Sequence, residues 1–124
     1  MARLTRSIAS ALAILLCGVT LSACGVGGAV SQARIACANV ERALRLQAAS
    51  EAPGLNALRR TQLQARAMAE LLKATPAAAS ATSIDGSWNP LMTTINEAER
   101  VPLSDLVPSL TRLCQVANSS TPYL

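Results

Sequence analysis

The sequence contains no histidine and no phenylalanine, and only one tryptophan and one tyrosine, Trp88 and Tyr123. Without histidine, the chain can form neither a Ser-His-Asp nor a Cys-His arrangement, and it lacks imidazole as a metal ligand and as a proton switch near neutral pH. With so few aromatic side chains, a core has to be built from Leu, Val, Ile, Met and Ala. These residues pack more readily between helices than across sheets, which favour β-branched and aromatic side chains.

The chain also has little net charge. Its formal charge is +4, and Arg3 and Arg6 contribute two of these units, so the remainder is close to neutral. Nucleic-acid-binding domains usually carry a clustered basic surface. We therefore predict no nucleic-acid partner.

Few groups remain that could carry a reaction. Lys73 is the one lysine, and we expect it in the last turn of a helix, where a cation favours the helix dipole. Glu97 and Glu99 are two residues apart, so they point to different faces of a helix and do not form a carboxylate pair. The glycines of residues 25–28 follow no strand, unlike those of a phosphate-binding loop. We predict that the protein is not an enzyme, and we assign no catalytic residue, metal site or cofactor.

The N-terminal segment has the layout of an export signal. Residues 1–6 carry two arginines, residues 8–19 form a short apolar stretch, and small residues follow. Residues 21–24 read Leu-Ser-Ala-Cys, which resembles the lipobox of bacterial lipoprotein precursors. In that family a diacylglyceryl group is attached to the cysteine sulfur, and a peptidase cuts just before that cysteine. The resemblance implies a signal peptide over residues 1–23 and a lipid on Cys24 that anchors the chain at the extracytoplasmic face of the cell membrane.

The second cysteine of this segment does not fit the lipobox. Cys17 follows Leu16, where a small residue is required, so we interpret it as part of the apolar run. An uncleaved membrane anchor is the alternative, because no charge occurs between Arg6 and Arg34 and residues 8–30 are long enough to span a bilayer. Glycine and hydroxyl residues make the second half of this stretch a poor membrane helix, which favours the lipoprotein interpretation.

Residues 24–29 show no periodicity and are expected to form a flexible leader. Over residues 30–118, apolar side chains recur at helical spacing. The predicted inward stripes are Val30, Ala33, Cys37, Val40, Leu44 and Ala48; Leu58, Ala65, Met68 and Leu72; Leu91, Ile95 and Ala98; and Leu103, Leu106, Val107, Leu110, Leu113, Cys114 and Ala117. The pattern predicts one all-α domain, a small antiparallel bundle of about four helices, followed by a tail at residues 119–124.

Turn and capping residues separate these helices. Pro53-Gly54 ends the first, and Thr75-Pro76 ends a second that spans residues 55–74. Residues 77–87 are rich in small side chains and are predicted to form a loop. Asn89 is the expected N-cap of the third helix, and Ser104-Asp105 offers a cap and a first-turn negative charge to the last.

Two cysteines remain for thiol chemistry once Cys24 is acylated. Cys37 lies on the stripe of the first helix and Cys114 on that of the last, and an even pair outside the cytoplasm favours a disulfide. Two buried free thiols are the alternative. A zinc site would need carboxylates for its other ligands, and a redox pair would usually be C-x-x-C.

Charged residues decorate the first two helices. Glu41 and Arg45 have the spacing of a favourable i,i+4 pair. Arg59, Arg60, Arg66, Glu70 and Lys73 lie on the second helix. We interpret them as a solvated face, with contact to anionic lipid head groups as the alternative.

Two classes of function fit this sequence: an interaction module and a carrier of a small ligand. We predict a non-catalytic interaction or envelope-scaffold module with a protein partner in the cell envelope. Trp88 either caps the core or is an exposed contact for that partner. The alternative function is binding of a small apolar ligand, lipid or haem, because an early and a late cysteine on a short helical domain resemble the layout of small actinobacterial haem carriers. The usual ligands of haem iron are missing, however, because the chain has no histidine and Tyr123 lies in the tail. Met68 and Met92 could bind iron, but methionines at such positions are more often core residues than iron ligands.

Overall fold

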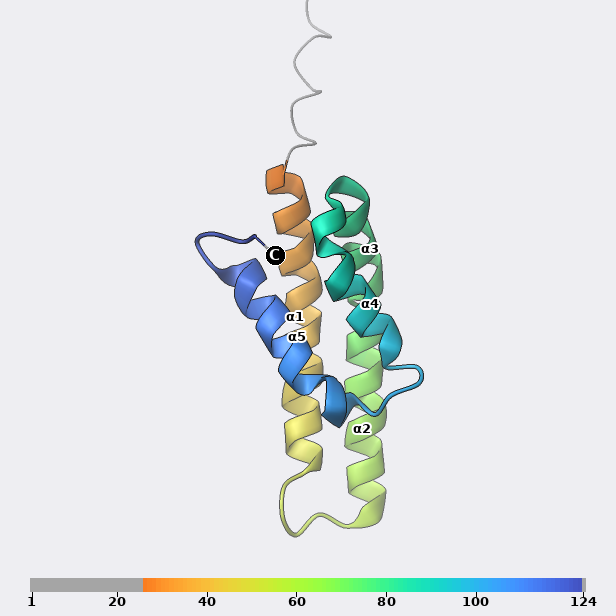
Figure 1. The fold of residues 1–124 in the computed structure, drawn as a ribbon. Coiled ribbons are helices and arrows are strands. Elements are labelled where there is room, and N and C mark those ends of the chain that lie inside the picture. The colour runs from red at the N-terminus through yellow and green to blue at the C-terminus, as the bar shows by residue number, and fades with distance from the viewer. Residues whose placement is uncertain (1–25, 124) are drawn as a thin grey trace, which may run out of the picture.

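The computed structural model describes residues 26–123, so Cys17, Cys24 and the predicted signal peptide lie outside the described residues. The elements are α1 (Val26–Ser50), α2 (Ala57–Leu72), α3 (Thr75–Ile84), the 3-10 turn η1 (Gly86–Trp88), α4 (Asn89–Glu97) and α5 (Leu103–Asn118). Helices α2 and α3 run alongside the long α1, and α5 crosses α1 obliquely (Figure 1). This part of the chain contains no strand, and the predicted small all-α bundle is confirmed.

Helix α1 is the central element. Its 25 residues span roughly 37 Å, and it packs against α2, α3 and α5. Its buried face is made largely of alanine, which lets the neighbouring helices approach closely; Ala29, Ala33, Ala36 and Ala43 are fully buried. Because α1 begins at Val26, residues 26–29 are helical and do not form the flexible leader that was expected there.

Helix α2 faces α1 with a different stripe from the one predicted. Leu63, Ala67 and Leu71 are buried, whereas Leu58 is 70% exposed and Leu72 is 46% exposed. The helix carries aliphatic residues on two opposite sides, and their spacing alone does not show which side is buried. Only contact with the alanine face of α1 decides between them.

Residues 75–84 form helix α3 in place of the predicted loop. Alanine has the highest helix propensity, and a proline in the first turn removes no hydrogen bond that the helix needs. The hydroxyl groups of Thr82 and Ser83 donate to the carbonyls four residues earlier, at 3.0 and 2.9 Å. Ala77, Ala78 and Ala81 are buried. The small side chains that suggested a loop are therefore what allows α3 to pack closely on α1.

The starts of α4 and α5 also differ from prediction. Trp88 holds the N-cap position of α4 and Pro102 that of α5, and neither helix has a side-chain cap. Asp85 instead caps η1, where its carboxylate accepts the Ser87 backbone N–H at 3.0 Å. The predicted stripes of both helices nevertheless face inward: Leu91, Ile95, Ala98, Leu103, Leu110, Leu113, Cys114 and Ala117 are buried.

Trp88 lies in the core. Its side chain is 1% exposed, and Leu71, Leu91, Ile95 and Leu110 are fully buried with it in one cluster. The η1 turn directs the indole inward, so Trp88 is not an exposed partner contact, and the core-capping alternative is the correct one.

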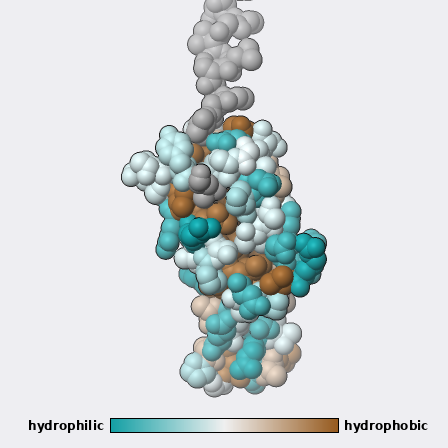
Figure 2. Space-filling model, viewed as in Figure 1, coloured by the Kyte–Doolittle hydropathy of each residue, from teal (hydrophilic) through white to brown (hydrophobic). Residues whose placement is uncertain are grey.

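In Figure 2, hydrophobic residues reach the surface near the N-terminal end of α5, between hydrophilic stretches.

Candidate functional site

The junction of α1 and α5 is fixed by a disulfide. Cys37 and Cys114 are bonded at an S–S distance of 2.06 Å, with their Cα atoms 5.4 Å apart. Both residues are buried, at 0% and 3% exposure. The predicted pairing is confirmed, and it holds the middle of α1 against the C-terminal half of α5.

Arg34, three residues before Cys37 on α1, binds the end of α5. Its Nε donates to the carbonyl of Ala117 at 2.8 Å, and a terminal guanidinium nitrogen donates to the carbonyl of Ser119 at 3.1 Å. Carbonyls at a helix C-terminus have no partner within the helix, and a cation there also interacts favourably with the helix dipole. Sequence reasoning missed this role. The available signal was the i,i+3 spacing from Cys37, which places Arg34 on the side of α1 that meets α5.

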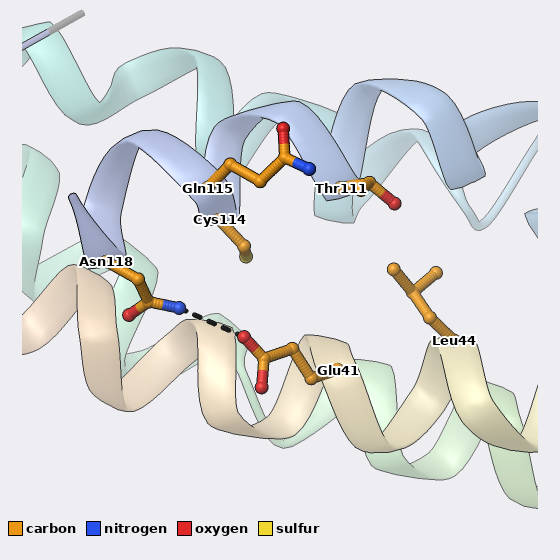
Figure 3. A pocket seen from close by; sticks show the side chains of 6 residues that line it. All are labelled: Glu41, Leu44, Thr111, Cys114, Gln115 and Asn118. Carbon is orange, nitrogen blue, oxygen red and sulfur yellow. Dashed lines mark hydrogen bonds between the residues drawn. The ribbon is translucent and has the colours of Figure 1, made fainter.

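Glu41 faces α5 one turn beyond Cys37. Its carboxylate accepts a hydrogen bond from the side-chain amide of Asn118, with an Nδ2–Oε1 distance of 3.0 Å (Figure 3). The ion pairs of the described residues do not include the predicted Glu41–Arg45 pair, because the carboxylate is turned towards α5. Arg34, Cys37 and Glu41 thus form one line of contacts along α1.

A groove of about 340 Å³ lies beside this line. Its lining consists of Glu41, Leu44, Thr111, Cys114, Gln115 and Asn118. In Figure 3, Glu41 and Leu44 project from α1, and the other four side chains come from α5. Glu41, Gln115 and Asn118 are exposed, while Leu44 is half-buried. The groove therefore combines an aliphatic wall with a carboxylate, two amides and a hydroxyl, a set suited to binding a partner side chain.

No known protein family, curated protein or solved structure matches this chain. Among residues 26–123, no three His, Cys, Asp or Glu side chains come together in a way that could hold a metal ion. Met68 and Met92 are half-buried and packed against the core, as expected of core fillers. No described helix has both the length and the hydropathy needed to cross a bilayer.

A second polar cluster joins α1 to α2. Glu70 pairs with Lys73 at an Nζ–Oε1 distance of 2.6 Å and with Arg42 at an Nε–Oε2 distance of 3.4 Å. The hydrogen bond from Lys73 is the main cause of a lowered pKa at Glu70; partial burial acts against it, and the charge of Lys73 and the contact with Arg42 lower the pKa further. At neutral pH the cluster therefore consists of one carboxylate and two cations. The predicted basic residues of α2, Arg59, Arg60 and Arg66, are all exposed.

Proposed function

We propose that this protein is a bacterial lipoprotein, anchored through Cys24 at the extracytoplasmic face of the cell membrane, whose helical domain is a non-catalytic interaction or scaffold module. The Cys37–Cys114 disulfide is the observation that carries this proposal. Such bonds persist in oxidising compartments and are rare in the cytoplasm. An export signal that ends in a lipobox would deliver the chain to such a compartment.

The same disulfide suits the domain to partner binding. Together with the Arg34 contacts, it holds the two walls of the α1–α5 groove in a fixed arrangement. Binding surfaces that are already ordered lose less conformational entropy when a partner docks. We expect the partner to be an envelope protein that places a hydrogen-bond donor at Glu41 and an apolar group against Leu44.

Mass spectrometry of the protein purified from membranes tests the anchor. We expect a chain that begins at Cys24 and carries acyl groups. Cys24→Ala should abolish the modification, whereas Cys17→Ala, a matched change in the same segment, should leave it intact. An intact Met1, or an unmodified Cys24 in the membrane-bound protein, would overturn the anchor.

Crosslinking in intact cells, followed by identification of the partners, tests the interaction role. Gln115→Lys places a long cation at the rim of the groove, and Gln64→Lys makes the same change on the exposed surface of α2. We expect the crosslinked species to disappear with the first variant and to persist with the second. Equal crosslinking of both variants would rule out the groove as the partner site.

A small apolar ligand is the second candidate. The groove volume of about 340 Å³ is at the lower end of the range of ligand pockets, roughly 300–1,000 Å³. Large side chains such as Trp88 and Leu71 are fully buried between the helices, and the groove is the site that we propose for such a ligand. A saturable Soret band on haem titration would favour this candidate over a protein partner, and a spectrum unchanged from free haem would contradict haem binding.

A further inference from the structure

The charged residues of the described chain are unevenly distributed. Residues 42–73 contain six basic and two acidic side chains, whereas residues 85–105 contain four acidic side chains and one basic. The first range covers about the last third of α1 and all of α2; the second covers η1, α4 and the start of α5. The stretch of residues 42–73 is therefore basic and that of residues 85–105 is acidic, although the net charge of the described residues is small.

Three of the four basic residues on and just after α2 share one side of the helix, and Arg60 lies off that side. Arg59, Arg66 and Lys73 are spaced by seven residues, and residues seven apart lie almost in line, two turns along the helix. All three are exposed. Arg42 of α1 extends this row, because it and Lys73 pair with the same carboxylate, Glu70.

We call Arg42, Arg59, Arg66 and Lys73 the basic face. Glu70 remains ionised because the hydrogen bond from Lys73 lowers its pKa. One carboxylate against four cations leaves a surplus of three positive charges. The basic face is therefore not balanced by the acidic group that it contains.

Large aliphatic side chains lie exposed beside the basic face. Leu58 and Leu72 precede Arg59 and Lys73 in the sequence and are 70% and 46% exposed. Ile35, 51% exposed, lies seven residues before Arg42 on the same side of α1. An exposed leucine is unremarkable by itself, but aliphatic side chains interleaved with unbalanced cations are typical of surfaces that contact the membrane interface.

We infer that the basic face binds an anionic lipid bilayer, with Leu58, Leu72 and Ile35 entering the head-group region. Cations near an anionic leaflet are attracted to it, and their aliphatic stems lie along the apolar boundary. A dissolved polyanion would use the four charges but would gain nothing from the leucines. The inference rests on the proposed anchorage and adds an orientation to it: the α1–α2 side towards the lipid, and the acidic stretch of residues 85–105 away from it.

Lys73 makes this orientation measurable, because it is the chain's only lysine. The full-length lipidated protein is reconstituted into phosphatidylcholine vesicles with or without phosphatidylglycerol, and acetylation of Lys73 is followed by mass spectrometry. We expect acetylation at least about threefold slower on the anionic vesicles, with the difference removed in about 1 M salt, where screening is nearly complete. Equal rates on both vesicles would overturn the inference.

Matched variants assign the effect to the basic face. Arg59→Gln/Arg66→Gln should restore fast acetylation on anionic vesicles, and Arg100→Gln/Arg112→Gln, with the same loss of charge in the turn after α4 and on α5, should not. Protection lost equally in both double variants would overturn the inference, since net charge alone would then explain it.

Leu58→Ser distinguishes a bilayer from any polyanion. It should weaken protection on anionic vesicles without changing protection by dissolved polyphosphate. Protection that is unaffected by Leu58→Ser would overturn the bilayer contact. Failure of the lipid anchor gives a different result from failure of this inference. A chain without an anchor dissociates from phosphatidylcholine vesicles. A chain that is anchored but whose basic face does not bind lipid stays attached, and its Lys73 is acetylated at the same rate on both kinds of vesicle.

Discussion

Trp88 supplies more volume to the interior than any other residue. In a core built mainly from alanine and leucine, it fills the space where η1, α3 and α4 meet. Its 1% exposure means that almost the entire indole is removed from water. One aromatic side chain thus compensates for the lack of phenylalanine in this sequence.

Replacement of Trp88 should be severe. We expect Trp88→Ala to lower the free energy of unfolding by about 3–5 kcal/mol, because it removes buried apolar surface and leaves a cavity. Chemical denaturation followed by circular dichroism measures the change. Tyr123→Ala is the control: this side chain is 74% exposed, and its removal should change stability by no more than about 0.5 kcal/mol. Similar losses in the two variants would contradict the packing described.

Glu70 makes stability depend on pH. Its pKa is lowered in the folded protein, chiefly by the hydrogen bond from Lys73. Its contribution is therefore present above the pKa of the unfolded chain and is lost as pH falls through the folded pKa. Between about pH 7 and about pH 3, on either side of the usual glutamate pKa, the wild type should lose more stability than Glu70→Gln. Urea midpoints at both pH values measure this, and identical losses would contradict it.

At the scale of elements, the sequence predicts the helices better than their faces. The inward stripes of α4 and α5 are correct because each of these helices has a single apolar side. Helix α2 has two apolar sides. Which of them faces α1 depends on the shape of α1, and the spacing of residues within α2 carries no information about that shape. Helix α3 was missed because alanine and serine are common both in loops and in helices that pack at close distance.

The close packing of α3 on α1 leaves little room for a larger side chain. Ala78 is fully buried in the core cluster, so Ala78→Leu should destabilise the fold by about 1–3 kcal/mol through overpacking. The matched control is Ala69→Leu, on the exposed side of α2, which we expect to be nearly neutral. Thermal unfolding of the two variants measures the contrast. Equal melting temperatures would show that the core near α3 can expand to accept the leucine.

At the scale of the molecule, one covalent bond encloses most of the domain. The bonded cysteines are 77 positions apart, and a loop of this size stabilises a fold by about 4–5 kcal/mol in the chain-entropy model. We expect Cys37→Ser/Cys114→Ser to lower the free energy of unfolding by up to this amount. Denaturant titration of the oxidised wild type and the double variant measures the difference. Equal stability, or thiols titratable in the oxidised unfolded protein at these positions, would contradict it.

The fold class could be predicted because helical periodicity is a local signal, and the disulfide because only one pair of cysteines remains once Cys17 and Cys24 are assigned to the N-terminal segment. The α1–α5 groove could not, since it depends on the angle at which α5 crosses α1. Arg34 and Asn118 have their roles only where α1 and α5 meet.

The disulfide also determines how the domain would transmit tension. If the chain is held at its N-terminal end alone and a partner pulls on α5 beyond Cys114, the force passes through the disulfide to Cys37 and along the first half of α1. Residues 38–113 lie outside that route. Helices α2, α3 and α4, together with Trp88, would then bear no load, so the domain could be pulled at both ends without unfolding these elements.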